Sequence, residues 1–189
     1  MNSLFARSLV VSAAWLAACA APAPSGPYVV ATLEPTAGST TAGVVFLIQE
    51  GNELQVTGRV SGLRPNQEHG FHVHEKGDCS SGDGMSAGGH FNPGGKPHGA
   101  PTAERHAGDL PSLKADADGR AVFRLRIAGN VLAAGPADFA GKAVIVHTMP
   151  DDYTTQPTGN SGARLACGVI SSVPGRDAAG RALPLPSQR

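Results

Sequence analysis

The sequence predicts an all-β domain in which eight strands form a closed barrel or a sandwich. Short runs rich in Val, Ile, Leu and Phe recur between clusters of Gly, Pro and Asn, and no stretch keeps the periodicity of an amphipathic helix. Full closure removes the exposed edges of a sheet, which favours the barrel. The expected strands cover residues 28–34, 43–49, 53–60, 70–75, 109–114, 121–127, 142–148 and 164–171.

Two tight turns and two long loops connect these strands. Glu50-Gly51-Asn52 predicts a hairpin between the second and third strands, and Asp116-Ala117-Asp118-Gly119 predicts one between the fifth and sixth. The connections 76–108 and 149–163 are much longer. Loops of such length inside a compact domain usually carry function, so we expect both to contribute to a site.

The two ends of the chain differ in composition from its middle, which predicts one domain, residues 28–172, with a tail at each end. Residues 173–189 are rich in Pro, Gly, Ala and Arg and are predicted to be a disordered tail. Residues 1–18 carry Arg7 and then an apolar run that only Ser12 interrupts, which predicts a secretory signal peptide.

Cys19 ends the sequence Leu-Ala-Ala-Cys, which resembles the cleavage box of bacterial lipoproteins. Residues 19–27 are then expected to be a lipidated cysteine with a flexible tether. The protein is accordingly expected in the periplasm or cell envelope, anchored to a membrane through Cys19. The alternative is an ordinary signal peptide that is cleaved further on, near Ala23.

Apart from Cys19, the chain has two cysteines, Cys79 and Cys167. An even number in an exported, oxidising compartment predicts a disulfide, which would stabilise the fold by roughly 4–5 kcal/mol on the chain-entropy model. The alternative is two free buried thiols. The formal net charge is zero, so any electrostatic attraction to a partner must be local.

A Gly- and Pro-rich run contains a candidate zinc site. His90, His98, His106 and Asp109 fall in this run and are therefore predicted to lie on a loop. Three imidazoles and a carboxylate make the closed, four-coordinate shell that a structural zinc ion prefers. The metal would also hold the loop, because its composition offers little apolar surface to bury.

Half of another metal site precedes this run. His72 and His74 are two residues apart in a predicted strand, with Phe71 and Val73 on the other parity. Because side chains of a strand alternate between faces, both imidazoles project the same way while Phe71 and Val73 point into the core.

Characteristic motifs run through nearly the whole predicted domain. They are His69-Gly-Phe-His-Val-His-Glu, His90-Phe-Asn-Pro, His98-Gly, Arg105-His-Ala-Gly-Asp109-Leu, Val146-His147 and Gly159-Asn-Ser-Gly-Ala-Arg-Leu-Ala-Cys-Gly-Val-Ile170. Together they resemble the copper/zinc superoxide dismutases, in particular the bacterial periplasmic, lipoprotein-type branch. This resemblance implies an eight-stranded flattened Greek-key β-barrel, an immunoglobulin-like sandwich, with two long functional loops.

The resemblance also implies one copper and one zinc ion per subunit. His90 would bind both metals as a bridging imidazolate, and the residue count agrees, since seven metal-facing residues can serve two four-coordinate sites only if one is shared. His147, taken alone, is explained better by a core histidine with satisfied hydrogen bonds, but a copper shell that is otherwise one imidazole short favours the ligand. The implied copper ligands are His72, His74, His90 and His147, and the implied zinc ligands are His90, His98, His106 and Asp109.

Two more residues receive roles by this resemblance. His69 is expected to be structural, with its ring hydrogen bonded to nearby backbone, and its strand parity is opposite to that of His72 and His74. Asp151 resembles a carboxylate of the family that accepts hydrogen bonds from one copper histidine and one zinc histidine. The neighbouring Asp152 is the alternative to Asp151.

The implied activity is that of an oxidoreductase that converts superoxide anion into oxygen and hydrogen peroxide and so protects the cell envelope from oxidative damage. Copper changes its oxidation state, zinc organises the site, and His90 passes a proton. Arg164 is expected to attract and orient superoxide, and the disulfide at Cys167 would fix its strand. Lys76 is a weaker candidate for the same attraction.

Two other functions fit parts of the sequence. One is an exported protein that buffers or delivers copper and zinc without turnover, against which Arg164 argues. The other is a structural zinc domain that has lost copper, against which His72 and His74 argue. The expected partners are superoxide and a membrane that is reached only through the lipid anchor, with no nucleic acid, while a homodimer is left open.

Overall fold

The structure is a computed structural model and describes residues 28–128, 132 and 135–172. The predicted signal peptide, lipidated Cys19, tether and C-terminal tail lie outside the described residues. Among the described residues, no helix has the length and hydrophobicity needed to cross a bilayer. The elements are β1 (Tyr28–Pro35), β2 (Ala42–Glu50), β3 (Glu53–Ser61), β4 (Glu68–His69), β5 (Phe71–His74), the short 3-10 helix η1 (Met85–Ala87), β6 (Leu113–Lys114), β7 (Ala121–Ala128), β8 (Ala143–His147), β9 (Arg164–Val169) and β10 (Ser171–Ser172).

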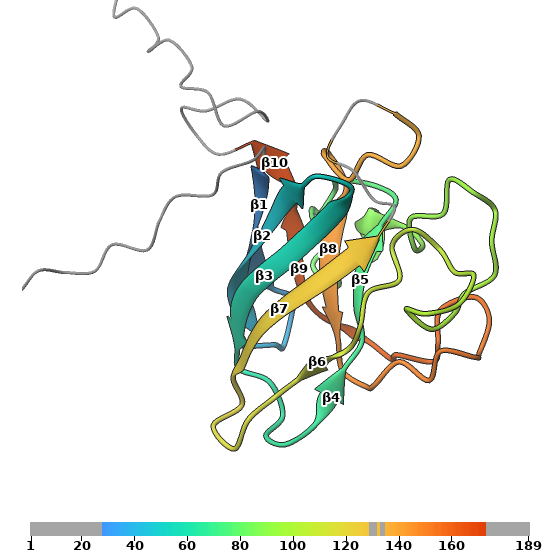
Figure 1. Cartoon of the computed structure of the whole chain (residues 1–189). Helices are drawn as coiled ribbons and strands as arrows, with labels where there is room; N and C mark the ends of the chain where they lie inside the picture. Colours follow the sequence, from blue (N-terminus) through green and yellow to red (C-terminus); the bar gives the residue numbers. More distant parts are fainter. Residues whose placement is uncertain (1–27, 129–131, 133–134, 173–189) are drawn as a thin grey trace, which may run out of the picture.

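One curled antiparallel sheet forms most of the fold (Figure 1). Its strands follow the order β5-β8-β9-β1-β2-β3-β7, and β10 pairs with β1. β4 and β6 form a separate two-stranded sheet. Several spatial neighbours, such as β9 beside β1 and β3 beside β7, are distant in the sequence, as Greek-key connections require. The predicted all-β, Greek-key fold is confirmed.

Side chains of β1 and β7 alternate between more and less buried, as the sequence pattern predicts, whereas all four residues of β5 are buried. In β5, Phe71 and Val73 are buried in the main core, and the ring of Phe71 meets that of Phe123 edge to face at 5.3 Å between centroids. Burying each such side chain stabilises the fold by roughly 1.5–3 kcal/mol. The histidines that alternate with these residues therefore take the opposite face of β5.

Three predicted strand boundaries are wrong. The strand expected at 109–114 is reduced to β6, because Pro111 has no N–H to donate to a ladder and Asp109 forms only an isolated backbone bridge with His72. Gly70 separates β5 from the unpredicted strand β4. The last predicted strand divides at Ile170 into β9, which pairs with β8 and with the end of β1, and β10, which pairs with the beginning of β1.

The two predicted turns have different outcomes. Glu50 pairs with Glu53, so Gly51 and Asn52 form the expected hairpin between β2 and β3. The second turn also forms, since the N–H of Gly119 donates to the carbonyl of Asp116. However, the flanking strands do not pair with each other: β6 pairs with β4, and β7 pairs with β3.

The first long loop is fixed to the sheet by a disulfide. Cys79 in this loop is bonded to Cys167 in β9, with 5.8 Å between the Cα atoms. The predicted disulfide is confirmed. The loop that follows β5 therefore lies against the strand that begins at Arg164, and this arrangement shapes the site described next.

Candidate metal centre

Two neighbouring strands present three of the candidate ligands on one face. β5 pairs with β8 so that His72 lies opposite Ile145 and His74 lies opposite Ala143. His147 comes two residues after Ile145 and therefore shares this face. A register irregularity between Val146 and His147 interrupts the pairing with β9, and such irregularities re-aim side chains.

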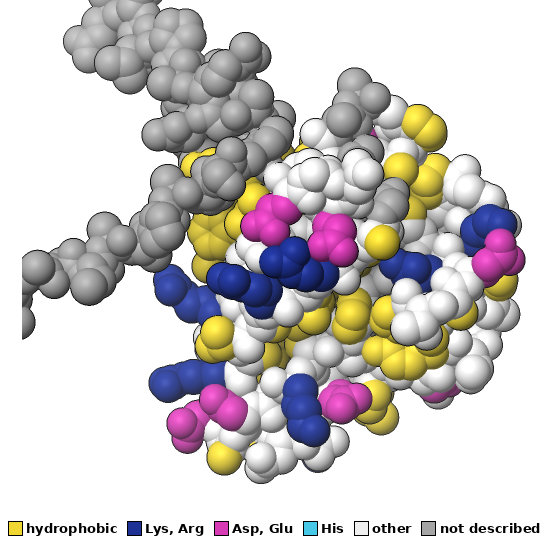
Figure 2. All heavy atoms as spheres, viewed as in Figure 1, with side chains coloured by type: hydrophobic (Ala, Val, Ile, Leu, Met, Phe, Trp, Pro, Cys, Tyr) yellow, Lys and Arg dark blue, Asp and Glu magenta, His cyan; other side chains and the backbone are white. Residues whose placement is uncertain are grey.

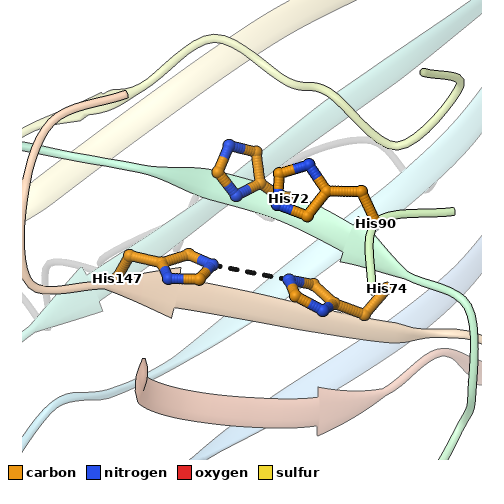
Figure 3. A group of neighbouring side chains, drawn as sticks. All are labelled: His72, His74, His90 and His147. Carbon is orange, nitrogen blue, oxygen red and sulfur yellow. Dashed lines mark hydrogen bonds between the residues drawn. The ribbon is translucent and has the colours of Figure 1, made fainter. Parts of the chain in front are cut away.

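His90 completes a group that we call the four-histidine cluster: His72, His74, His90 and His147. It arrives from the first long loop and forms an isolated bridge with His74. Nε2 of His147 lies 3.4 Å from Nε2 of His74, and the rings of His72 and His90 are 4.0 Å apart (Figure 3). One ring nitrogen from each residue lies within 4.8 Å of the others, and all four residues are buried.

A second group, which we call the three-histidine cluster, consists of His90, His98, His106 and Asp109 and is equally compact. Oδ1 of Asp109 lies 2.8 Å from Nδ1 of His90 and 3.3 Å from Nδ1 of His106. Oδ2 of Asp109 lies 3.0 Å from Nδ1 of His98. Donor atoms on a tetrahedron around zinc lie roughly 3.3 Å apart, so these separations suit zinc.

Unpaired ring nitrogens test whether the two clusters fit metal ions. His72 Nδ1, His90 Nε2, His98 Nδ1 and His106 Nδ1 are buried and have no hydrogen-bond partner. Leaving a buried polar atom unpaired costs roughly 1–3 kcal/mol. Nδ1 of His98 does approach Asp109, but without hydrogen-bond geometry, as expected of two atoms that face a common centre. Imidazole and carboxylate donors suit copper and zinc, so the residues fit both ions.

His90 is the residue that the two clusters share. Its Nδ1 faces Asp109 in the three-histidine cluster, whereas its Nε2 is unpaired and buried. The ring lies 4.0 Å from that of His72 and 5.3 Å from that of His98, between centroids. A single imidazole therefore stands between the two candidate metal sites.

Asp151 joins the outer nitrogens of the two clusters. Its Oδ2 accepts a hydrogen bond from Nε2 of His72 at 2.7 Å, and its Oδ1 accepts one from Nε2 of His98 at 2.9 Å. Both bonds keep the proton on Nε2 and direct the lone pair of Nδ1 inward. The neighbouring Asp152 instead caps Thr154 and Thr155 in an exposed turn.

Backbone carbonyls orient the remaining histidines of the four-histidine cluster. Nδ1 of His74 donates to the carbonyl of Gly88 at 2.9 Å, and Nδ1 of His147 donates to that of Gly162 at 3.1 Å. Each bond leaves Nε2 unprotonated in the neutral ring, so Nε2 is the atom that can bind a metal. No feature of the sequence identifies a carbonyl acceptor, so sequence reasoning missed both glycines.

Three histidines of the four-histidine cluster, His72, His74 and His147, are held neutral by their surroundings. Burial lowers the pKa of His72 and of His74 well below the ordinary value, and the neighbouring histidines lower it further. Burial also lowers the pKa of His147 to about 4. Metal binding requires neutral imidazole, so this environment favours it.

Asp109 is held in its charged form. Burial alone would raise the pKa of this carboxyl, but the hydrogen bond from His90 and the charges of the adjacent histidines hold it below the usual value. The backbone N–H groups of Gly99 and His106 also donate to Oδ2. A fixed carboxylate on this side supplies the negative charge that a zinc shell needs.

Arg164 begins β9 opposite His147 and is fixed in place. Its guanidinium donates to the carbonyls of Gly84 and Gly88, both at 2.6 Å. The carbonyl of Gly88 therefore joins Arg164 to His74. Burial lowers the pKa of Arg164, but a guanidinium stays protonated at neutral pH. This places a cation next to the four-histidine cluster.

His69 and Lys76 lie outside both clusters. Nδ1 of the buried His69 donates to the carbonyl of His147 at 2.8 Å, so this histidine supports the strand of a candidate ligand. Lys76 is exposed and borders a hollow together with Glu75, Phe91 and Lys142.

Two residues of the second loop also hold the site and were missed by sequence reasoning. The side-chain amide of Gln156 accepts from the N–H of His98 and donates to its carbonyl, both at 2.8 Å. Gly159 has a φ of +65°, and a Cβ at this position would overlap Asp151 and His98. Only the excess of glycine in the metal-binding loops hints at such positions in the sequence.

Comparison with known proteins gives this geometry a family. Residues 41–170 match the copper/zinc superoxide dismutase family. A superoxide dismutase [Cu-Zn] 2 from Brassica juncea is 47% identical over 136 residues, and the match covers 68% of this chain and 88% of the relative. The chain belongs to the copper/zinc superoxide dismutase family, which confirms the predicted family and enzyme class.

Solved structures show the same likeness. The clock protein EA4 superposes with a TM-score of 0.71 at 37% identity, and the match covers 82% of this chain and 99% of that protein. A double mutant of a SOD-like protein from Bacillus subtilis superposes with a TM-score of 0.66 at 38% identity, covering 76% of this chain and 97% of that protein. The curled Greek-key sheet is thus shared with relatives of the family.

Proposed function

We propose that this protein converts superoxide into oxygen and hydrogen peroxide, with one copper and one zinc ion per subunit. The four-histidine cluster would hold copper, and the three-histidine cluster would hold zinc. When bound, copper supplies one-electron redox chemistry and zinc supplies charge without redox change. The observation that carries the proposal is His90, whose two ring nitrogens face two separate sets of ligand atoms.

His90 would handle the proton of the reaction. Its Nδ1 is fixed beside Asp109, so Nε2 is the atom that is free to take up a proton and release it. The burial of both clusters limits other proton donors near Nε2. The proton from Nε2 would be delivered to the departing peroxide.

Arg164 would bind and orient the substrate. Its guanidinium is fixed by two carbonyls, and a preorganised cation of this kind attracts a small anion with little loss of side-chain entropy. Attraction by a fixed charge at the mouth of a site raises the association rate in a salt-dependent way. A protein that only stored the metals would have no use for such a cation.

Superoxide decay followed by stopped-flow absorbance tests the reaction. Protein containing copper and zinc should accelerate the decay, cyanide should abolish the acceleration, and protein containing zinc alone should be inactive. Stoichiometric binding of both metals without faster decay would instead support metal storage or delivery.

We also propose that the protein is exported to the periplasm or cell envelope, belongs to the bacterial lipoprotein-type branch and is anchored by acylated Cys19. The apolar segment before Cys19 and the Leu-Ala-Ala-Cys sequence support this proposal, as does the disulfide, which favours an oxidising compartment. Superoxide removal there would protect the envelope. Mass spectrometry of the mature protein should find acyl chains on Cys19, and a Cys19→Ser variant should lack them.

A further inference from the structure

The outward side of β1, β2, β3 and β7, which we call the outer face, carries several apolar side chains among its polar ones. An antiparallel sheet that shows one side to water normally has polar side chains there. Here the strand register places Val30 beside Phe46 and Val44 beside Arg59, and all three apolar residues are half-buried. Val122 lies directly opposite Arg59 and is 85% exposed. This face therefore has the composition of a contact surface.

Three arginines surround Val122, and we call Arg59, Arg120 and Arg124 the arginine cluster. The register puts Arg124 diagonally across from Arg59, at a spacing of roughly 7–8 Å between backbones. Arg59 and Arg120 border a hollow of about 330 Å³ that Val122 also lines. Within the described part of the chain, none of the three arginines forms an ion pair.

The rest of the outer face is closer to charge balance. Arg126, further along β7, pairs with Glu50 at 3.4 Å and with Glu53 at 3.0 Å. The unbalanced positive charge is therefore concentrated around Val122. Figure 2 shows Lys and Arg side chains over the region where Figure 1 draws β3 and β7, with hydrophobic side chains between them and acidic side chains beside them at the upper end.

We propose that the outer face docks on an anionic lipid bilayer, with a headgroup phosphate in the hollow between Arg59 and Arg120. Guanidinium groups match the geometry of phosphate oxygens, and the apolar residues between them suit the interfacial region. The inference rests on the proposed lipid anchor at Cys19 and is independent of the superoxide reaction.

The length of the chain before β1 favours a bilayer as the occupant. Tyr28 begins β1 and lies on the outer face, opposite Ile48. Nine peptide steps separate it from Cys19, so the anchored end can lie at most about 30 Å from the sheet. A tether of this length raises the effective concentration of lipid at the outer face, so that weak charge contacts suffice for docking.

Docking in this orientation would leave the metal centre accessible. The candidate ligands lie on β5, β8 and the long loops, which are on the other side of the curled sheet from the outer face (Figure 1). The bilayer would thus meet the arginine cluster while Arg164 faces away from the anionic surface. Superoxide could then reach the site without crossing a layer of like charge.

Partition of the full-length protein into lipid vesicles tests the proposal. Partition coefficients are measured for two kinds of vesicle. One contains equal parts of phosphatidylglycerol and phosphatidylcholine, and the other contains phosphatidylcholine alone. The ratio of the first coefficient to the second removes the contribution of the anchor. Each arginine near an anionic surface strengthens binding about fivefold, so this ratio should be about 100. The variant with Arg59→Gln, Arg120→Gln and Arg124→Gln should bring it below about 10.

A matched variant controls for net charge. Lys76→Gln, Lys96→Gln and Lys114→Gln remove the same charge from exposed residues outside the outer face and should leave the ratio within about twofold of the parent. Val122→Glu, a change at one exposed residue, should lower the ratio about tenfold. Inorganic phosphate at constant ionic strength should not release the protein from vesicles.

Several results would overturn the proposal. A ratio of partition coefficients near 1 for the parent would do so, as would an equal fall of this ratio in both triple variants. Release of the protein from vesicles by inorganic phosphate would also do so. So would a dimer that light scattering detects for the parent and not for the arginine variant. The last result would assign the outer face to a second copy of the chain. Unchanged thermal unfolding of the variants would show that each change acts on the surface and not on the fold.

Discussion

Asp151 shows how one carboxylate fixes two metal sites at once. Asp151→Asn should lower the affinity for zinc by about 10- to 100-fold and should also weaken copper binding. The amide keeps the shape of the side chain but offers one acceptor oxygen, whereas His72 and His98 both need one. Competition titrations with metal chelators would measure both affinities.

Asp152→Asn is the matched control for this change. Asp152 is adjacent and exposed, and its carboxylate accepts hydrogen bonds only from Thr154 and Thr155 in its own turn, so its substitution should leave metal affinity within about twofold. If both variants lost zinc equally, the role given to Asp151 would be wrong.

The buried histidines make the stability of the metal-free protein depend on pH. The pKa of His147 in the folded protein is about 4, below its ordinary value of 6.5, so the unfolded chain binds more protons between these values. The free energy of unfolding should therefore fall as the pH falls through this window. From about pH 7.5 to about pH 5 we expect His147 alone to cost roughly 2 kcal/mol, and His72 and His74 act in the same direction.

Urea unfolding of the metal-free protein at these two pH values measures this dependence. The copper- and zinc-containing protein should lose at least as much free energy of unfolding over the same range, because bound metal excludes protons from the ring nitrogens of the folded state while the unfolded chain still binds them. Equal stability of the metal-free protein at both pH values would contradict the burial of neutral histidines.

Arg164 should control the rate through its charge. Arg164→Gln should slow superoxide decay by at least tenfold at low ionic strength and should weaken the dependence of the rate on salt. Arg164→Lys should keep part of the rate, since a lysine retains the charge but cannot donate to Gly84 and Gly88 in the same geometry. A salt dependence equal to that of the parent would show that another group attracts the anion.

At the scale of the elements, the disulfide links the first long loop to β9. Cys79→Ser together with Cys167→Ser should lower the free energy of unfolding by roughly 3–5 kcal/mol. The same loop carries Gly84 and Gly88, so the variant should also lose the fixed position of Arg164 and part of its activity. Chemical denaturation and the salt dependence of the rate would check the two effects, and a loss of stability alone would refute the second.

Elements that follow from side-chain alternation could be predicted, and those that depend on pairing partners could not. The strands β1, β2, β3 and β7 were predicted nearly in full because their apolar residues repeat every second position. The strand expected at 109–114 failed because Asp109 turns toward the metal centre and Pro111 cannot join a ladder. β4 has two residues, too few for any periodic signal.

The candidate metal ligands could be predicted from the sequence, whereas the residues that hold them in place could not. Histidine and carboxylate have a metal chemistry of their own, so the zinc set and half of the copper set could be named from residue type and spacing. His147 and the sharing of His90 followed from the family resemblance, and the structure brings all of these residues into two clusters. Gly88, Gly162 and Gln156 hold these ligands through backbone atoms or loop contacts. Such roles depend on how distant loops meet, which residue type alone does not encode.

At the scale of the whole molecule, the curled sheet separates two surfaces that have different tasks. One side carries both metal clusters beneath the long loops, and the other is the outer face with the arginine cluster. The account as a whole depends on the first side, where a single imidazole must serve two metal ions. If His90 did not bind both metal ions, its position between the two clusters would not explain how copper and zinc act together.

Copper EPR tests this central claim most directly. The spectrum of copper-containing protein should change when zinc is added, because His90 would hold both ions and zinc would alter the imidazole that this residue offers to copper. In a His90→Ala variant that still binds copper, adding zinc should leave the copper spectrum as it was. A parent spectrum that does not respond to zinc, or a variant that responds as the parent does, would contradict the shared histidine.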